Sequence, residues 1–123
     1  MYDSFKTKKT LKIGKKTYTY YSLKHAEKNG LKHVSSLPYS IKVLLENLIR
    51  HEDDKTVLKS DILEFQKWKK QKKIAKEISF RPARVLMQDF TGVPAVVDLA
   101  SMRSAIKDKK GDPKKINPLS PVD

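Results

Sequence analysis

A polar pair, Gln88-Asp89, stands between two apolar segments and is the first candidate for chemistry in this sequence. The apolar run at residues 85–87 precedes it, and a break at residues 91–94 follows it. A glutamine amide can donate to a carboxylate without the desolvation cost of a second buried charge. Gln88 is therefore a candidate ligand contact. The alternative is that both residues only cap the turn through side-chain hydrogen bonds.

The segments around this pair predict a strand, a tight turn and a helix. Residues 84–88 are a short apolar run bounded by turn residues, which is typical of a buried strand. Pro94 suits the first helical position and Gly111 suits the end of a helix. This order is the basic unit of an α/β fold, in which ligands bind outside the carboxyl ends of strands. The packed face of the helix is expected to comprise Val96, Val97, Ala100, Ser101, Ala105 and Ile106.

The sequence lacks the residues or the spacing for several other kinds of site. The 123-residue chain has no cysteine, which excludes disulfides, thiolate nucleophiles and cysteine-held metal sites within it. His25, His33 and His51 have no metal-ligand spacing and are expected at the surface. The chain starts without the apolar core of a secretory signal, and no run approaches the ~18 apolar residues of a membrane helix. We expect a soluble, cytoplasmic protein with no membrane partner.

The charge balance raises the possibility of a polyanionic partner. Lys and Arg number 27 against 14 Asp and Glu, for a net charge of +13. Such an excess favours nucleic-acid binding. However, only four of these residues are arginines, and lysine offers point charge without bidentate base readout. RNA binding and a merely solvated lysine-rich surface both remain open at this point.

The first half of the chain predicts a hairpin and three helices. Residues 11–21 have the pattern of two strands around Gly14, and residues 22–30 that of a short helix capped by Ser22. Residues 38–50 carry one broad apolar stripe and predict the clearest helix, with Ser36 as its cap. A further helix from residue 60 should carry Ile62, Phe65 and Trp68 inward. Residues 77–80 should be extended, and the proline-rich residues 111–123 extended or turning.

Three longer motifs give a resemblance to a known family. LPYSIKVLLENLIRHED, RPARVLMQDFTGVPAVVDLASMR and GDPKKINPLSPVD closely resemble the opening of aconitate hydratase, in the branch of bacterial aconitase A and the cytosolic aconitase/iron-regulatory proteins. This resemblance covers residues 18–123. It implies an incomplete three-layer α/β/α aconitase-type first domain over those residues, truncated before the family's Asp-His-Ser motif, with residues 1–17 as an N-terminal extension that contains short strands.

The resemblance also implies a function. Members interconvert citrate and isocitrate through cis-aconitate on a [4Fe-4S] cluster held by three cysteines, and Gln88 matches the family's substrate-binding glutamine. By this resemblance, the catalytic residues and the metal ligands lie in the remainder of the aconitase chain, so this segment should have no activity alone. Two alternatives stay open, which are an RNA-binding module derived from the iron-regulatory branch and a dehydratase acting on 2-methylcitrate or 2-methylisocitrate.

Overall fold

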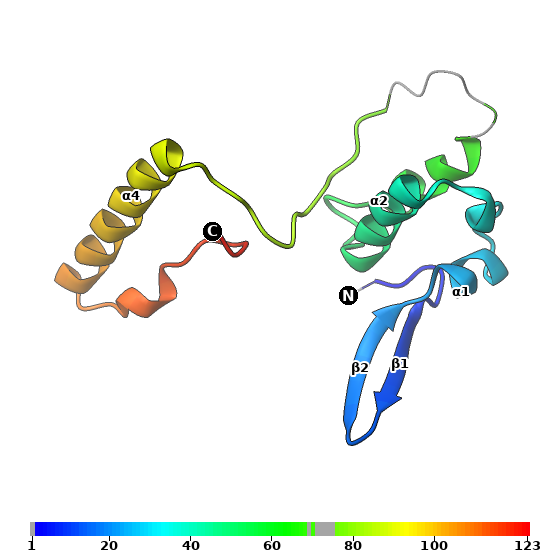
Figure 1. Cartoon of the computed structure of the whole chain (residues 1–123), viewed down its shortest axis with the longest axis horizontal. Helices are drawn as coiled ribbons and strands as arrows, with labels where there is room; N and C mark the ends of the chain where they lie inside the picture. The colour runs from blue at the N-terminus through cyan, green and yellow to red at the C-terminus, as the bar shows by residue number, and fades with distance from the viewer. Residues whose placement is uncertain (1, 69, 71–75) are drawn as a thin grey trace. The chain divides into compact units, whose positions relative to one another are not determined.

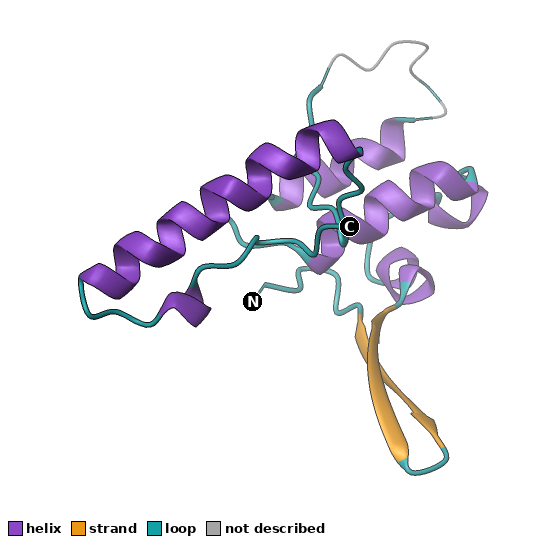
Figure 2. Cartoon of the chain, turned by 60° about the vertical axis from the view of Figure 1, so that its left-hand side comes forward, coloured by secondary structure: helices purple, strands orange, loops and turns teal. Residues whose placement is uncertain are grey.

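The computed structural model describes residues 2–68, 70 and 76–123 (Figures 1 and 2). The chain divides into two compact units, Met1–Arg81 and Pro82–Asp123, which we call the N-terminal and the C-terminal unit. This division differs from the predicted one between residues 17 and 18, which falls inside a strand of the N-terminal unit. The predicted boundary rests on the resemblance and stays a prediction.

The N-terminal unit opens with an antiparallel hairpin, as predicted. Strand β1 (Lys8–Ile13) pairs with strand β2 (Lys16–Tyr21), so β1 begins three residues earlier than expected. The two-residue turn places Gly14 at φ +59°, a conformation that glycine adopts without steric cost. A positive φ at the first turn position matches the right-handed twist of the strands. The turn therefore fixes the pairing register, in which Leu11 lies opposite Tyr18.

The helices that follow hold the apolar stripe. Helix α1 (Leu23–Lys28) is capped by Ser22 as predicted, and helix α2 (Tyr39–Arg50) buries Leu45, Leu48 and Ile49. The prediction that Ser36 caps α2 is wrong, because Pro38 is the N-cap residue. Ser36 belongs instead to the 3-10 turn η1 (Val34–Ser36), where its hydroxyl donates to the carbonyl of His33.

The core lies entirely in the N-terminal unit. Helix α3 (Lys59–Glu64) contributes the buried Ile62, and the 3-10 turn η2 (Phe65–Lys67) follows directly. Phe65 packs against the core, but Trp68 is 41% exposed, so only the first of these aromatic residues is packed as predicted. The buried hydrophobic residues are Phe5, Ala26, Leu31, Val34, Leu37, Leu45, Leu48, Ile49, Val57 and Ile62.

In the C-terminal unit, the prediction of a buried strand at residues 84–88 is wrong. Residues 84–88 are extended, but only Val85 takes part in a bridge, which is parallel and joins it to Val122. Leu86 is 85% exposed. A strand is buried only when neighbours cover its faces and pair with its edges. Residues 117–123 fold back toward this run, and we call them the returning segment. Within the described residues, this segment is the only pairing partner of the run at residues 84–88.

Helix α4 (Asp89–Asp108) also differs from the prediction at its start. It begins five residues before Pro94, which lies inside it, so residues 91–92 are helical and form no turn. Its end was predicted more closely, because Lys110 adopts φ +60° and the N–H of Gly111 donates to the carbonyl of Ile106 at 2.8 Å. Together with the bond from the N–H of Lys110 to the carbonyl of Lys107, this is a Schellman ending.

The described residues thus form a mixed α/β structure, with one two-stranded sheet and an extended–helix–extended unit. The three-layer arrangement remains a prediction. The last 3-10 turn, η3 (Pro113–Lys115), leads into the returning segment. No helix of the described residues is long and apolar enough to cross a membrane.

Candidate functional site

A groove of about 950 Å³ lies within the C-terminal unit and contains the predicted site residue. Residues 87–89 line one side, and helix α4 lines a second between Gly92 and Met102. The third wall is the returning segment, residues 117–123. The groove therefore combines the end of the first extended run, the start of a helix and the paired chain that follows it. This is the position at which open α/β folds bind ligands.

Gln88 occupies the N-cap position of helix α4. Its backbone carbonyl accepts from the N–H of Thr91 at 3.1 Å and from the N–H of Gly92 at 3.0 Å, and it also accepts from the Thr91 hydroxyl. Its side chain makes no capping hydrogen bond, although the sequence left that role open. The backbone of Gln88 is thus fixed by the first turn of the helix, and its side chain lines the groove.

The returning segment is held against residues 85–87 by three backbone hydrogen bonds. The N–H of Val85 donates to Pro121 at 2.8 Å, that of Asp123 to Val85 at 3.0 Å, and that of Met87 to Asp123 at 2.9 Å. The Asp123 carboxylate also lies 3.0 Å from the guanidinium of Arg84. Sequence reasoning missed this wall of the groove, because the single Val122 among prolines is too short a signal for a strand.

The charge of the groove is negative. Asp89, Asp98 and Asp123 line it, and its described lining includes neither lysine nor arginine. Asp89 suits the first turn of α4, where the helix dipole favours an acidic side chain. A bound carboxylate would meet these three acids and would need cations from elsewhere to hold it. Gln88 is a neutral donor among the lining residues that could approach such an anion.

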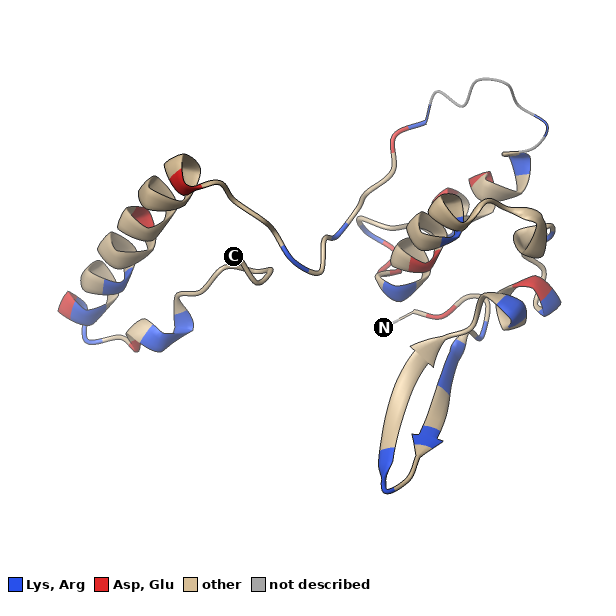
Figure 3. Cartoon of the chain, viewed as in Figure 1, with Lys and Arg blue, Asp and Glu red and all other residues tan. Residues whose placement is uncertain are grey.

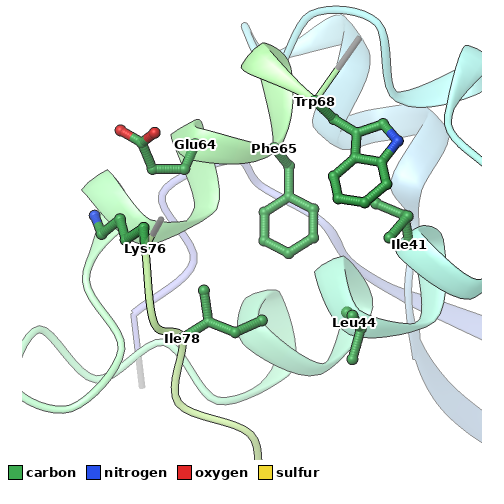
Figure 4. A pocket seen from close by; sticks show the side chains of 7 residues that line it. All are labelled: Ile41, Leu44, Glu64, Phe65, Trp68, Lys76 and Ile78. Carbon is green, nitrogen blue, oxygen red and sulfur yellow. The ribbon is translucent and has the colours of Figure 1, made fainter. Parts of the chain in front are cut away.

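A second hollow, of about 140 Å³, lies in the N-terminal unit (Figure 4). The side chains of Ile41 and Leu44 from α2 face Phe65, while Trp68 and Ile78 close its sides (Figure 4). These five residues are apolar, and the ionic side chains of Glu64 and Lys76 lie at its edge (Figure 4). Their carboxylate and ammonium groups supply no acid–base pair directed into the hollow. It is therefore a packing defect beside the core.

The histidines do not assemble a site. The ring of His25 lies 3.0 Å from the Ser22 hydroxyl, and burial and the nearby Lys9 lower its pKa. Burial and the guanidinium groups of Arg81 and Arg50 lower the pKa of His51. Within the described residues, no three His, Cys, Asp or Glu side chains come together in a way that could hold a metal ion.

The C-terminal unit is thus an extended–helix–extended piece of an α/β protein, with the amide of Gln88 at the start of its helix. The model of the aconitase family (aconitate hydratase) matches residues 58–123, which include the whole groove. The chain therefore belongs to the aconitase family.

Curated relatives match almost the whole chain. It is 68% identical over 121 residues to aconitate hydratase A of Bradyrhizobium diazoefficiens, which covers 98% of this chain and 13% of that protein. It is 59% identical to the Legionella pneumophila aconitate hydratase A over 98% of this chain and 14% of the relative. The Escherichia coli protein of the same name is 56% identical over 95% of this chain and 13% of the relative. The chain thus spans about 13% of the length of such relatives.

The iron–sulfur cluster that the family implies does not fit the residues of this chain. Such clusters are held by cysteine thiolates, and the sequence has none. None of its three histidines is among the residues that line the groove. The segment therefore supplies no thiolate ligand for such a cluster.

Proposed function

We propose that this chain is the N-terminal segment of a cytoplasmic aconitate hydratase, a hydro-lyase that interconverts citrate and isocitrate through cis-aconitate. In this proposal Gln88 donates its side-chain N–H to a substrate carboxylate, and the remainder of the aconitase chain supplies the other groups. The observation that carries the proposal is the position of Gln88 in a matched family segment, with its backbone bound in the helix start and its side chain lining the groove.

The segment's own chemistry is limited to binding and orientation. The positive end of the α4 dipole favours an anion near Gln88, and the amide adds a directed hydrogen bond. Asp89, Asp98 and Asp123 oppose the same anion, so the isolated segment should hold citrate weakly and should be inactive. Since the described lining of the groove includes no lysine or arginine that could distinguish one tricarboxylate from another, 2-methylcitrate or a related acid remains an alternative substrate.

The test uses a chimera in which this chain replaces the 121 aligned residues of the Bradyrhizobium diazoefficiens enzyme. Gln88→Ala removes the donor and should cost about 1–3 kcal/mol of transition-state binding, or about one to two decades in kcat/KM. Gln88→Glu should be worse, because a second negative charge adds repulsion. Gln66 provides matched control substitutions, since it lies in η2 of the other unit.

The measurement is kcat/KM per folded, cluster-loaded site. A purely structural role predicts a lower melting temperature and unchanged kinetics of the folded enzyme. If the wild type, Gln88→Ala and Gln88→Glu agree within about twofold, a difference too small for a charged contact, the assignment of Gln88 is wrong.

A second candidate function, RNA binding, is favoured by the surface of the hairpin. The stretch from Ser4 to Ala26 contains no acidic residue, and Figure 3 shows basic residues along β1 and at the start of β2. In the observed register Lys9 lies opposite Tyr20 and Leu11 opposite Tyr18, so both tyrosines share one face with Lys9. Exposed aromatic rings beside lysines can stack on bases and neutralise phosphates.

RNA binding has its own test. The logarithm of the binding constant of the chain for a single-stranded RNA should fall linearly with the logarithm of salt concentration. A double substitution, Tyr18→Ser with Tyr20→Ser, should weaken binding, while Thr17→Ser with Thr19→Ser on the opposite face should not. Salt-independent or tyrosine-independent binding would remove this second candidate and leave the first untouched.

A further inference from the structure

Arg103 of helix α4 joins the helix to the returning segment. Its Nε donates to the carbonyl of Ile116 at 3.0 Å, and its Nη2 donates to the side-chain oxygen of Asn117 at 2.7 Å. The amide of Asn117 in turn donates to the carbonyl of Lys114 at 2.6 Å. One guanidinium thus holds two acceptors, and Asn117 fastens the turn that precedes it. The planar fork of arginine suits this geometry, which lysine cannot reproduce.

This tie lies where the chain changes direction. After α4 the chain passes through η3, whose first residues are capped by the Asp112 carboxylate accepting from the N–H of Lys114. It then turns at Asn117 and returns to pair with Val85. Arg103 therefore acts at the near end of the returning segment, while the backbone bonds to residues 85–87 hold its far end.

Both ends of the returning segment affect the position of one wall of the groove. Asn117 is at once the partner of Arg103 and a lining residue, and the segment that follows it is the wall facing Gln88. The far end is anchored by Ser120, whose hydroxyl donates to the carbonyl of Pro82 at 3.0 Å. If the near end were released, this wall would be held only through its last residues. The width of the groove beside Gln88 would then vary.

We propose that Arg103 is a positioning residue, which sets the place of the 117–123 wall and thereby the geometry in which Gln88 meets a substrate carboxylate. This inference rests on the function proposed above. Arg103 itself does not line the groove, so its effect on substrate must pass through the wall. It follows that Arg103 and Gln88 should be energetically coupled, although they lie at different positions of the same helix unit.

The experiment is a double-mutant cycle in the chimera described above. Arg103→Ala should lower kcat/KM by about tenfold, less than the ~100-fold loss that an ångström-scale displacement can cause. In the Gln88→Ala background the same substitution should cost no more than about twofold, because the Gln88 contact whose geometry the wall sets is gone. Lys107→Ala is the control, since it removes a cation of the same helix near its last turn.

Hydrogen exchange provides a readout independent of turnover. The amides of residues 85–87 and of the non-proline residues within 117–123 should exchange faster in Arg103→Ala than in Lys107→Ala, while those of α2 stay unchanged. Arg103→Lys keeps the charge and most of the stem, and it serves if Arg103→Ala does not fold. Arg103→Lys should lower kcat/KM less than Arg103→Ala does, and its effect should likewise depend on the presence of Gln88.

The outcomes separate the two proposals. If Gln88→Ala impairs the enzyme and Arg103→Ala behaves like Lys107→Ala, or if the two losses simply add, the positioning role is overturned and the proposed function stands. If Gln88→Ala leaves kcat/KM unchanged, both fall together. A non-additive cycle with faster exchange at the wall supports the proposal.

Discussion

Ser4 and Glu52 are joined by two hydrogen bonds across 48 residues of sequence. The Ser4 N–H donates to one carboxylate oxygen at 2.9 Å, and its hydroxyl donates to the other at 2.5 Å. Glu52 is only 4% exposed and lies just after α2, so this pair closes the N-terminal segment over the core beside Phe5. A buried carboxylate is tolerated here because both of its oxygens are satisfied.

Replacing Glu52 should destabilise the N-terminal unit. Glu52→Ala leaves the Ser4 donors unpaired, and we expect a loss of about 1–3 kcal/mol in the free energy of unfolding. Urea titration followed by the signal of Trp68 measures it. Glu46→Ala is the control, because its pair with Arg50 is exposed and such pairs contribute little. Equal losses for the two variants would contradict the role of the Ser4–Glu52 pair.

The stability of the same unit should depend on acid through Asp53. Hydrogen bonds from the Val57 N–H, the Thr56 hydroxyl and the Lys55 N–H lower the pKa of this carboxyl well below its usual range. Since the folded pKa lies below the unfolded value of ~3.9, the stabilisation is complete above that value. It is lost as the pH falls below it towards the folded pKa.

Asp53→Asn should therefore flatten the decline of the urea midpoint between about pH 5 and pH 2. The same substitution at the exposed neighbour Asp54 should leave the decline as it is in the wild type. If both variants decline in parallel with the wild type, the hydrogen bonds to Asp53 do not contribute as we describe.

The ending of helix α4 offers a stabilising substitution. Lys110 adopts φ +60°, which costs a residue with a Cβ about 1–2 kcal/mol. Lys110→Gly should raise the stability of the helix by roughly 0.5–1 kcal/mol after the entropy that glycine loses on folding. Slower amide exchange over residues 104–108 would show it. Lys109→Gly, at φ −81°, should instead destabilise.

Replacing the glycine at the end of helix α4 should be unfavourable. A Cβ on Gly111 would lie 2.8 Å from Cγ2 of Ile106, which is closer than carbon atoms pack. Gly111→Ala should therefore speed exchange over the same residues. Unchanged exchange in Gly111→Ala would show that Ile106 moves aside without cost.

An apolar stripe on α4 should make the isolated chain bind hydrophobic dyes. Phe90, Val93 and Val97 follow helical spacing, and Phe90 is 88% exposed. Phe90→Ser should reduce the fluorescence of a bound dye, because exposed contiguous apolar surface is what such dyes report. Tyr39→Ser is the control, since Tyr39 is 86% exposed but stands beside Lys42 on α2. Equal reduction by the two substitutions would show that the stripe is not the binding surface.

The features predicted correctly from sequence are those whose physical cause is local. The turn at Gly14, the cap at Ser22 and the spacing of Leu45, Leu48 and Ile49 each fix an element through neighbouring residues. The prediction that Pro94 is the first residue of the helix is wrong for a physical reason. Proline is tolerated best where the N–H has no helical partner, but α4 begins early enough that Pro94 should have bonded Phe90. Helix α4 therefore forms without a hydrogen bond from residue 94 to the carbonyl of Phe90.

The features predicted less well depend on distant partners. The run at residues 85–87 has the composition of a buried strand, but burial requires strands and helices that cover it, and the described residues offer only the segment at Val122. The wall of the groove likewise arises from Arg103 and Asn117, which are fourteen residues apart and carry no joint signal in the sequence. Gln88 was predicted at the end of a strand, before a helix that begins at Pro94, whereas it is the N-cap residue of α4. Its role stays a prediction.

The parallel pairing of Val85 and Val122 bears on how this chain behaves in solution. Two paired segments leave two outer edges whose backbone groups can join to another copy, which is a route to aggregation. The net charge of +13 works against it, since like-charged molecules repel. Salt shortens the range of that repulsion to about 10 Å at 0.1 M. Purification at low ionic strength should therefore limit aggregation, and added salt should favour it.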